Sequence, residues 1–253
     1  MLVFFQTHTT ILYIYAFVVG ATITSFICLA AERLPHQLRW RDEFKRNYTI
    51  CSPPSSCNEC EQRIPFMFLV PLVGYLACGG RCVHCGFKIP IRYPLIELFG
   101  GVGTVFCFYY FGIGLLGGEA GCLFLILLFL SIIDIYEHWL PAIVTYPLFW
   151  CGLLFSSFCI DLNMRVIGAA LGFYTLYCAM FLLSLWKKED LFAGGDIALA
   201  TAAGAWLGIE NMPMFFMITS LSYIIYGLPM RLKGYRFSPM GPALAIGFMF
   251  CLL

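Results

Sequence analysis

Apolar stretches long enough to cross a lipid bilayer follow one another along most of this 253-residue chain. A spanning helix needs about 20 consecutive, mostly apolar residues. Only 11% of the residues are charged, against about 25% in soluble domains. The sequence therefore predicts an all-α fold, a polytopic transmembrane helical bundle of about eight spans. These spans lie near residues 11–31, 95–116, 119–137, 140–160, 166–186, 195–210, 212–230 and 239–253.

Lysine and arginine are distributed unevenly among the connections between these spans. Basic residues mark cytoplasmic loops, and the net charge of +1 gives no indication of nucleic acid binding. No basic residue precedes Arg33, so we expect an uncleaved first span with its N-terminus outside. In that orientation Arg165 alone lies on the far side. Three cytoplasmic loops hold the other basic residues: Arg33, Arg39, Arg41, Lys45, Arg46, Arg63, Arg81, Lys88, Arg92, Lys187, Lys188, Arg231, Lys233 and Arg236.

This orientation places two carboxylates at the same depth, near the cytoplasmic boundary. Asp134 lies in the last turns of an inward-running span, and Asp196 lies in the first turn of an outward-running one. Ionisable residues within spans are rare and usually face a cavity or a partner. Each acid also has a structural interpretation. Asp196 could cap its helix, and Asp134 could be an interfacial acid paired with a base.

The two acids together favour a catalytic interpretation. Two carboxylates that share a site cannot both ionise easily. One then keeps a proton while the other takes a proton from water, as in aspartic proteases. Gly194 and Gly195 precede Asp196 and would let the backbone approach a substrate closely, although small residues also serve helix packing. We therefore predict that Asp134 and Asp196 are catalytic, supported by Gly194 and Gly195.

Four of the thirteen cysteines form two C-x-x-C pairs in the long loop after the first span. These are Cys57 with Cys60 and Cys82 with Cys85. The cytoplasm is reducing, which disfavours disulfides, and four thiolates in two such pairs suit tetrahedral zinc better than four unrelated thiols. A site with four cysteine ligands has no open position, so the zinc would be structural. The loop would be a zinc-stapled cytoplasmic segment between spans 1 and 2.

Five motifs, in order along nearly the whole chain, resemble the bacterial type IV prepilin peptidases, which are membrane aspartic proteases of the GxGD group. They are "GATITSFICLAAERLP" (20–35), the cysteine loop with "IPIRYPLIEL", "DIYEHWLPAIVTYPLF" (134–149), "FAGGDIALATAAGAWLG" (192–208) and "SPMGPALAIGF" (238–248). The chain departs from the family at Ala142, where many members carry an acid, and at Ala198, where a base is frequent. Neither departure touches the two aspartates or the four cysteines.

The resemblance implies an enzyme of the bacterial inner membrane that cleaves the basic leader from type IV prepilins or pseudopilins at the cytoplasmic face. Many members then methylate the new N-terminus with S-adenosylmethionine. Glu97, at the start of the second span, is a candidate contact for substrate or methyl donor, or else a solvated interfacial acid. The implied cofactors are structural Zn²⁺ and, if methyl transfer is present, S-adenosylmethionine. The partners are prepilin or pseudopilin and membrane lipid, with no nucleic acid.

Three segments follow from this assignment: 1–31 as the first span, 32–94 as the cytoplasmic loop with the four-cysteine zinc site, and 95–253 as the membrane peptidase core. Two alternatives stay open. One is a protease of the same chemistry acting on other membrane substrates. The other is a proton-coupled transporter, although such proteins have internal repeats and midplane sites, whereas no repeat is visible here and both acids lie at one edge. The sequence gives no oligomeric state.

Overall fold

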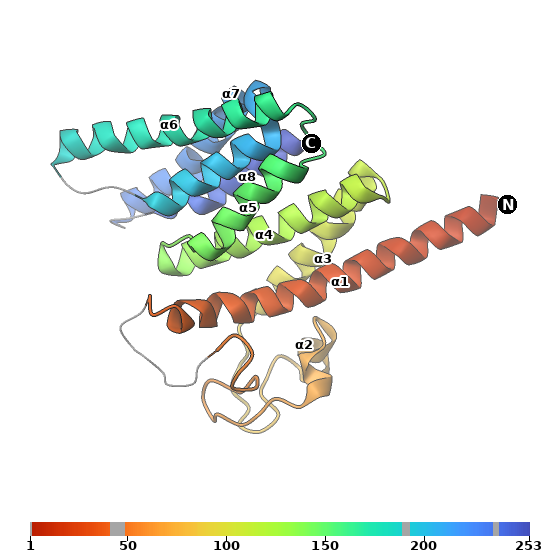
Figure 1. Cartoon of the computed structure of the whole chain (residues 1–253). Helices are drawn as coiled ribbons and strands as arrows, with labels where there is room; N and C mark the ends of the chain where they lie inside the picture. The colour runs from red at the N-terminus through yellow and green to blue at the C-terminus, as the bar shows by residue number, and fades with distance from the viewer. Residues whose placement is uncertain (1, 41–48, 189–192, 235–237) are drawn as a thin grey trace. The chain divides into compact units, whose positions relative to one another are not determined.

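The computed structural model describes residues 2–40, 49–188, 193–234 and 238–253. Within these ranges the protein is helical, and two isolated bridges are its only β-structure. The prediction of an all-α fold is therefore confirmed. The helices, drawn in Figure 1, are α1 (Leu2–Gln37), η1 (Phe66–Leu69, a 3-10 helix), α2 (Val73–Ala77), α3 (Arg92–Phe111), α4 (Leu115–Glu137), α5 (Ala142–Phe155), α6 (Leu162–Lys187), α7 (Gly194–Leu232) and α8 (Gly241–Leu252).

Five helices among the described residues are long and apolar enough to cross a membrane. They are Thr9–Gln37 of α1, α3, α4, α6 and Gly194–Met230 of α7. The predicted spans 140–160 and 239–253 coincide with apolar helices that are shorter than a full crossing. These are α5 with 14 residues and α8 with 12. Two more lie end to end in α7, where Gly208 leaves the helical conformation with φ 71° and ψ 170°. The helices agree with a multi-pass membrane protein.

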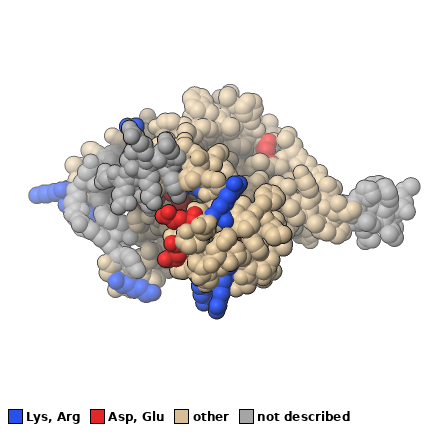
Figure 2. Space-filling view, turned by 90° about the horizontal axis from the view of Figure 1, so that it is seen from below, with Lys and Arg blue, Asp and Glu red and all other residues tan. Residues whose placement is uncertain are grey.

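Part of the charge pattern falls outside the described residues. This applies to Arg41, Lys45, Arg46 and Arg236, and to the side chain of Arg231. On the face drawn in Figure 2, uncharged side chains cover most of the described surface, and charged side chains are gathered in a few places. Large apolar side chains such as Ile160 and Trp186 are 90% and 80% exposed. Broad exposed apolar surface is expected where lipid replaces water.

The chain forms two compact units, Met1–Leu125 and Ile126–Leu253, which divide within α4. In the first unit α1 packs along α3. Gly20 lies against Thr104, and Gly100 lies against Thr24, so closely that neither glycine could carry a Cβ without a clash. Small residues at such positions let membrane helices approach each other. The three functional segments expected from the sequence are a different division and stay a prediction.

In the second unit α7 packs against α5, α6 and α8. Gly168 and Gly172 of α6 lie directly against the backbone of α7 at Gly204 and Ala200. Small side chains such as Ala200 are fully buried there. This close packing fixes the first turns of α7, and with them Asp196, within the unit.

Candidate active site and metal centre

Asp134 lies near the end of α4 and is only 5% exposed. Its Oδ2 accepts a hydrogen bond of 2.6 Å from the backbone N–H of Gly241, the first residue of α8. The free N–H groups and the dipole at a helix N-terminus favour a neighbouring carboxylate. The start of α8 therefore fixes the orientation of the Asp134 carboxyl group.

Gly241 can make this contact because it has no side chain. A Cβ built at this residue would lie 2.8 Å from Oδ2 of Asp134 and 2.9 Å from its Cβ. Sequence reasoning recognised "SPMGPALAIGF" as a motif but gave Gly241 no role. The available signal was a glycine followed by Pro242, since proline is favoured in the first turn of a helix.

Asp196 lies in the first turn of α7. Its Oδ1 is buried and has no hydrogen-bond partner among the described residues. The carboxyl group is close enough to Asp134 for the two to interact electrostatically. The structure thus brings into one unit two acids that are distant in sequence. Such an arrangement can share a proton and activate a water molecule.

The two glycines before Asp196 have different surroundings. A Cβ at Gly195 would lie 2.7 Å from the Cβ of Leu140 and 2.9 Å from its backbone oxygen. Gly195 therefore lets the start of α7 pack against the turn between α4 and α5. A Cβ at Gly194 would meet no described atom within 4 Å. Gly195 therefore has to lack a side chain, because it packs against Leu140 of this same chain. The structure shows no such requirement at Gly194.

Tyr226 of α7 was missed by sequence reasoning. Its hydroxyl donates to the backbone oxygen of Pro239 at 2.6 Å and accepts from the N–H of Ala243 at 3.2 Å. This hydroxyl is near enough to Asp134 and Asp196 to interact with both carboxyl groups electrostatically. Tyr226 thus connects α7 to the start of α8, which holds Asp134. A single tyrosine in an apolar helix gives no sequence signal of such a role.

The four predicted metal ligands lie together in the first unit. Their sulfur atoms are all within 4.8 Å of one another. Cys57 and Cys85 are 3.8 Å apart, and Cys60 and Cys82 are 3.9 Å apart. Four sulfurs at about 2.3 Å from a tetrahedral zinc ion are separated by about 3.8 Å. The predicted clustering is therefore confirmed, and the distances fit a zinc ion.

The two C-x-x-C segments repeat one turn. Each lies between the residues of an antiparallel bridge, Ser56 with Arg63 and Arg81 with Lys88. The N–H of Cys57 donates to Gln62, and that of Cys82 donates to Phe87 at the matching position. The left-handed residue of the turn is Glu61 in the first copy, with φ 56°, and Gly86 in the second, with φ 73°.

The repeated turn also prepares a sulfur to bind metal. Backbone N–H groups of Cys85 and His84 donate toward Cys82 and lower the pKa of its thiol from 9.0 to about 6. The His84 contact measures 3.5 Å. Metal binds the thiolate rather than the thiol, so these N–H groups favour the form of Cys82 that binds metal.

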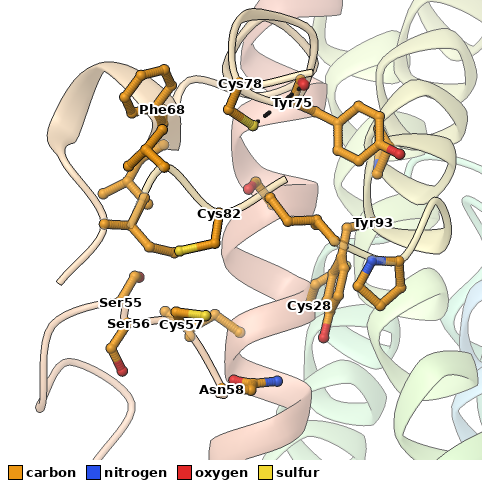
Figure 3. A pocket seen from close by; sticks show the side chains of 18 of the residues that line it. Cys28, Ser55, Ser56, Cys57, Asn58, Phe68, Tyr75, Cys78, Cys82 and Tyr93 are labelled. Carbon is orange, nitrogen blue, oxygen red and sulfur yellow. Dashed lines mark hydrogen bonds between the residues drawn. The ribbon is translucent and has the colours of Figure 1, made fainter. Parts of the chain in front are cut away.

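Glu97 is half-buried in the first turns of α3. Its Oε2 accepts the backbone N–H of Leu72 at 2.8 Å. It lines an open cavity of about 280 Å³ between α1, α3 and the cysteine loop. Figure 3 shows loop side chains, including Cys57 and Cys82, on one side of this cavity and Cys28 with Tyr93 on the other. Glu97 is therefore part of a structured pocket, and its predicted role in binding stays a prediction.

Residues 18–111 match the family described as Bacterial Peptidase A24 N-terminal domain. Residues 121–228 match the Type IV leader peptidase family. The two matches together contain Asp134, Asp196, Glu97 and the four clustered cysteines.

Several curated proteins named Prepilin leader peptidase/N-methyltransferase are similar over most of their length. The protein of Burkholderia pseudomallei (strain K96243) is 34% identical, over 92% of this chain and 82% of the relative. That of Neisseria gonorrhoeae is 34% identical, over 91% and 86%. That of Pseudomonas aeruginosa is 30% identical, over 100% and 94%. No solved structure matches the chain.

Proposed function

This chain belongs to the type IV leader peptidase family, and we propose that it removes the leader peptide from type IV prepilins or pseudopilins and then methylates the new N-terminus. Because the chain belongs to a peptidase family, the alternative of a proton-coupled transporter is dropped. The observation that carries the proposal is the placement of Asp134 and Asp196 in one unit, within electrostatic reach of each other. We propose that both aspartates are catalytic.

The two carboxyl groups share one proton during hydrolysis. The ionised member takes a proton from water, and the resulting hydroxide attacks the scissile carbonyl. The protonated member polarises that carbonyl or donates to the leaving amine. Because coupled acids titrate as a pair, the two roles belong to the dyad. The Gly241 N–H and the packing of Gly195 on Leu140 keep the carboxyl groups in position.

The topology proposed for this reaction has eight membrane crossings with the N-terminus outside. Segment 1–31 forms the first crossing, loop 32–94 lies in the cytoplasm, and segment 95–253 forms the peptidase core. The dyad then faces the cytoplasm, where the basic leader of a prepilin would lie. The location is the bacterial inner membrane, and a prepilin enters laterally as an apolar helix.

Zinc is proposed to fold the loop. Cys57, Cys60, Cys82 and Cys85 would hold one ion, and their spacing of about 3.8–3.9 Å supports this assignment. A site with four cysteine ligands has no open position for water or substrate. The ion would therefore stabilise loop 32–94 and take no part in hydrolysis.

The decisive experiment is leader removal from a purified prepilin in detergent, followed by mass measurement of the product. The wild type should release the leader and add a methyl group. Asp134→Asn and Asp196→Asn should release no leader while inserting in the membrane normally. A double-Asn variant that cleaves at the wild-type rate would overturn the proposal. Cleavage of an unrelated membrane peptide in place of prepilin would favour the same-chemistry alternative.

A further inference from the structure

The connection between the two cysteine pairs contains an uncharged run that the proposed chemistry does not use. Residues 64–80, "IPFMFLVPLVGYLACGG", lie between Arg63 and Arg81 and form η1 and α2 in the first unit. We propose that this segment is a membrane anchor, which inserts its exposed apolar side chains into phospholipid beside α1 and α3. The cysteine loop is thereby held at the membrane surface. The inference rests on the proposed topology only for the choice of the inner leaflet.

η1 and α2 expose large apolar side chains. Phe66 is 85% exposed, Leu76 is 76% exposed, Met67 is 68% exposed and Val73 is 60% exposed. No residue of η1 is buried, and Gly74 is the one buried residue of α2. Apolar surface gathered in this way marks a contact with lipid or with another protein. The side chains of Phe66, Met67, Val73 and Leu76 are called the anchor surface below.

A contact with α3 places the segment beside a helix that is long and apolar enough to cross a membrane. The backbone N–H of Leu72, directly before α2, donates to Oε2 of Glu97 at 2.8 Å. Glu97 lies about 8 Å along the helix axis from Arg92, the first residue of α3. The start of α2 is therefore held against the side of α3 and not beyond its end.

α1 indicates the same depth. Ser25 and Cys28 line the cavity of the first unit together with Phe68 of η1, and Figure 3 shows Cys28 and Phe68 beside this cavity. Ser25 lies about 12 Å before Arg33 along the axis of α1, in the apolar part of the crossing helix Thr9–Gln37. At this depth lipid surrounds the protein. The anchor surface, which the rest of the chain leaves exposed, therefore faces lipid.

The backbone of the segment suits such an environment. Polar backbone groups within a membrane need partners inside the protein. Pro65 and Pro71 have no N–H group, the N–H of Phe68 donates to the backbone oxygen of Pro65 at 3.0 Å, and the N–H of Gly74 donates to that of Val70 at 2.8 Å. Gly74 also lets η1 and α2 pack together, because a Cβ there would overlap the backbone of Phe68. These internal bonds allow a short, irregular segment to lie in lipid.

Basic residues lie at both ends of the uncharged run. Arg63 and Arg81 are exposed, and they belong to the bridges with Ser56 and Lys88. Anionic headgroups attract basic side chains at the membrane surface, and long basic side chains reach that level from apolar surroundings. An apolar surface beside basic residues is typical of segments that lie in the membrane interface. The charges therefore agree with a phospholipid partner.

The apolar helix of a prepilin could also cover the anchor surface. However, η1 and α2 have only four and five residues, whereas a helix that crosses a membrane has about 20. Two such short elements give a crossing helix little surface to pack along. Lipid is also present at this depth whether or not substrate is bound. We therefore assign the surface to phospholipid, and the test below separates the two partners.

Photo-crosslinking of the full-length protein in vesicles of phosphatidylethanolamine and phosphatidylglycerol tests the anchor. Phe66→p-benzoylphenylalanine and Leu76→p-benzoylphenylalanine introduce a group that, under light, attaches to neighbouring C–H bonds. The same replacement at Val102, 53% exposed on α3, is the lipid-facing control, and at the exposed Glu59 it is the water-facing control. A large apolar side chain favours lipid over water by about tenfold or more. Mass spectrometry should find lipid adducts at Phe66 and Leu76 as at Val102, about tenfold above Glu59.

The outcomes decide between the partners. Lipid adducts at Phe66 and Leu76 without prepilin support the anchor, and yields no higher than at Glu59 overturn it. Adducts that form with added prepilin and not with lipid also overturn it and assign the surface to substrate. The replaced side chains are all exposed, so the variants should elute like the wild type in size-exclusion chromatography. Because no step uses leader cleavage, lipid adducts in a protein that cleaves no prepilin would keep the anchor and contradict the proposed function.

Discussion

Each unit of the chain contains a pair of acids, and the two pairs are built differently. In the second unit Asp134 is buried and bonded to a backbone N–H, and Asp196 has a buried oxygen without a partner among the described residues. In the first unit Glu32 and Glu97 are each fixed by a donor beside a cavity that also holds Arg33. The acids of the second unit can share a proton and act on a water molecule, whereas those of the first unit are each hydrogen-bonded and line a cavity.

The largest expected effect is a loss of cleavage when one acid of the second unit is replaced. Asp196→Asn should lower the cleavage rate by about 10⁴-fold or more, because the proton shared by the dyad is lost. The zinc content should stay that of the wild type, because the four cysteine ligands lie in the first unit. Mass spectrometry of the product and elemental analysis of the protein check both. A parallel loss of zinc would contradict the division of roles.

The next effect should come from the metal ligands. Cys57→Ser combined with Cys85→Ser should remove zinc, measured by elemental analysis, because two of four ligands are lost. Cys57 and Cys82 also line the cavity, so the loop around it should lose its fold and become sensitive to added protease. Cleavage should fall less.

Cys178→Ser is the matched control for the cysteine pair, because Cys178 is exposed on α6 and is not one of the four clustered cysteines. This variant should keep its zinc. A loss of cleavage in the double variant as large as that in Asp196→Asn would show that the loop supports the dyad.

A smaller effect on cleavage alone is expected from Gly241→Ala. The new Cβ would overlap the Asp134 carboxyl group and displace it, and a displacement of about 1 Å can cost about 10²-fold in rate. Gly118→Ala on α4 is the matched control, since its Cβ would meet no described atom within 4 Å. Initial rates with a synthetic prepilin check this. A Gly241→Ala enzyme with the wild-type rate would mean that this contact does not position the dyad.

The smallest effects should come from the two turns of the metal loop. Gly86→Ala places a side chain at φ 73° and should destabilise the loop by about 1 kcal/mol. Glu61→Gly relieves the equivalent residue at φ 56° and should leave stability equal or slightly higher. The midpoint temperature of zinc release reports both changes. Neither should alter the cleavage rate, and a change there would connect the loop to the dyad.

Local and chemical signals were readable in the sequence. Asp134 and Asp196 stand out because charge is rare in apolar helices, and the Cys57 and Cys82 pairs follow a short-range pattern that each turn closes within a few residues. The Gly241 contact and the cavity at Glu97 were not readable, because both depend on packing between segments distant in sequence. Helix ends were also missed. The run 140–160 is mostly apolar, but α5 begins after Pro141 and ends at Phe155.

The shortness of α5 has a consequence for water. Its 14 residues extend about 21 Å, whereas the hydrocarbon layer is about 30 Å thick. A crossing helix of this length produces hydrophobic mismatch, which lipids relieve by thinning locally. Headgroups and their hydration shell would then be drawn inward around the start of α5, next to Leu140, against which Gly195 packs beside Asp196. A thinned leaflet can thus deliver the water that hydrolysis consumes without a dedicated channel through the protein.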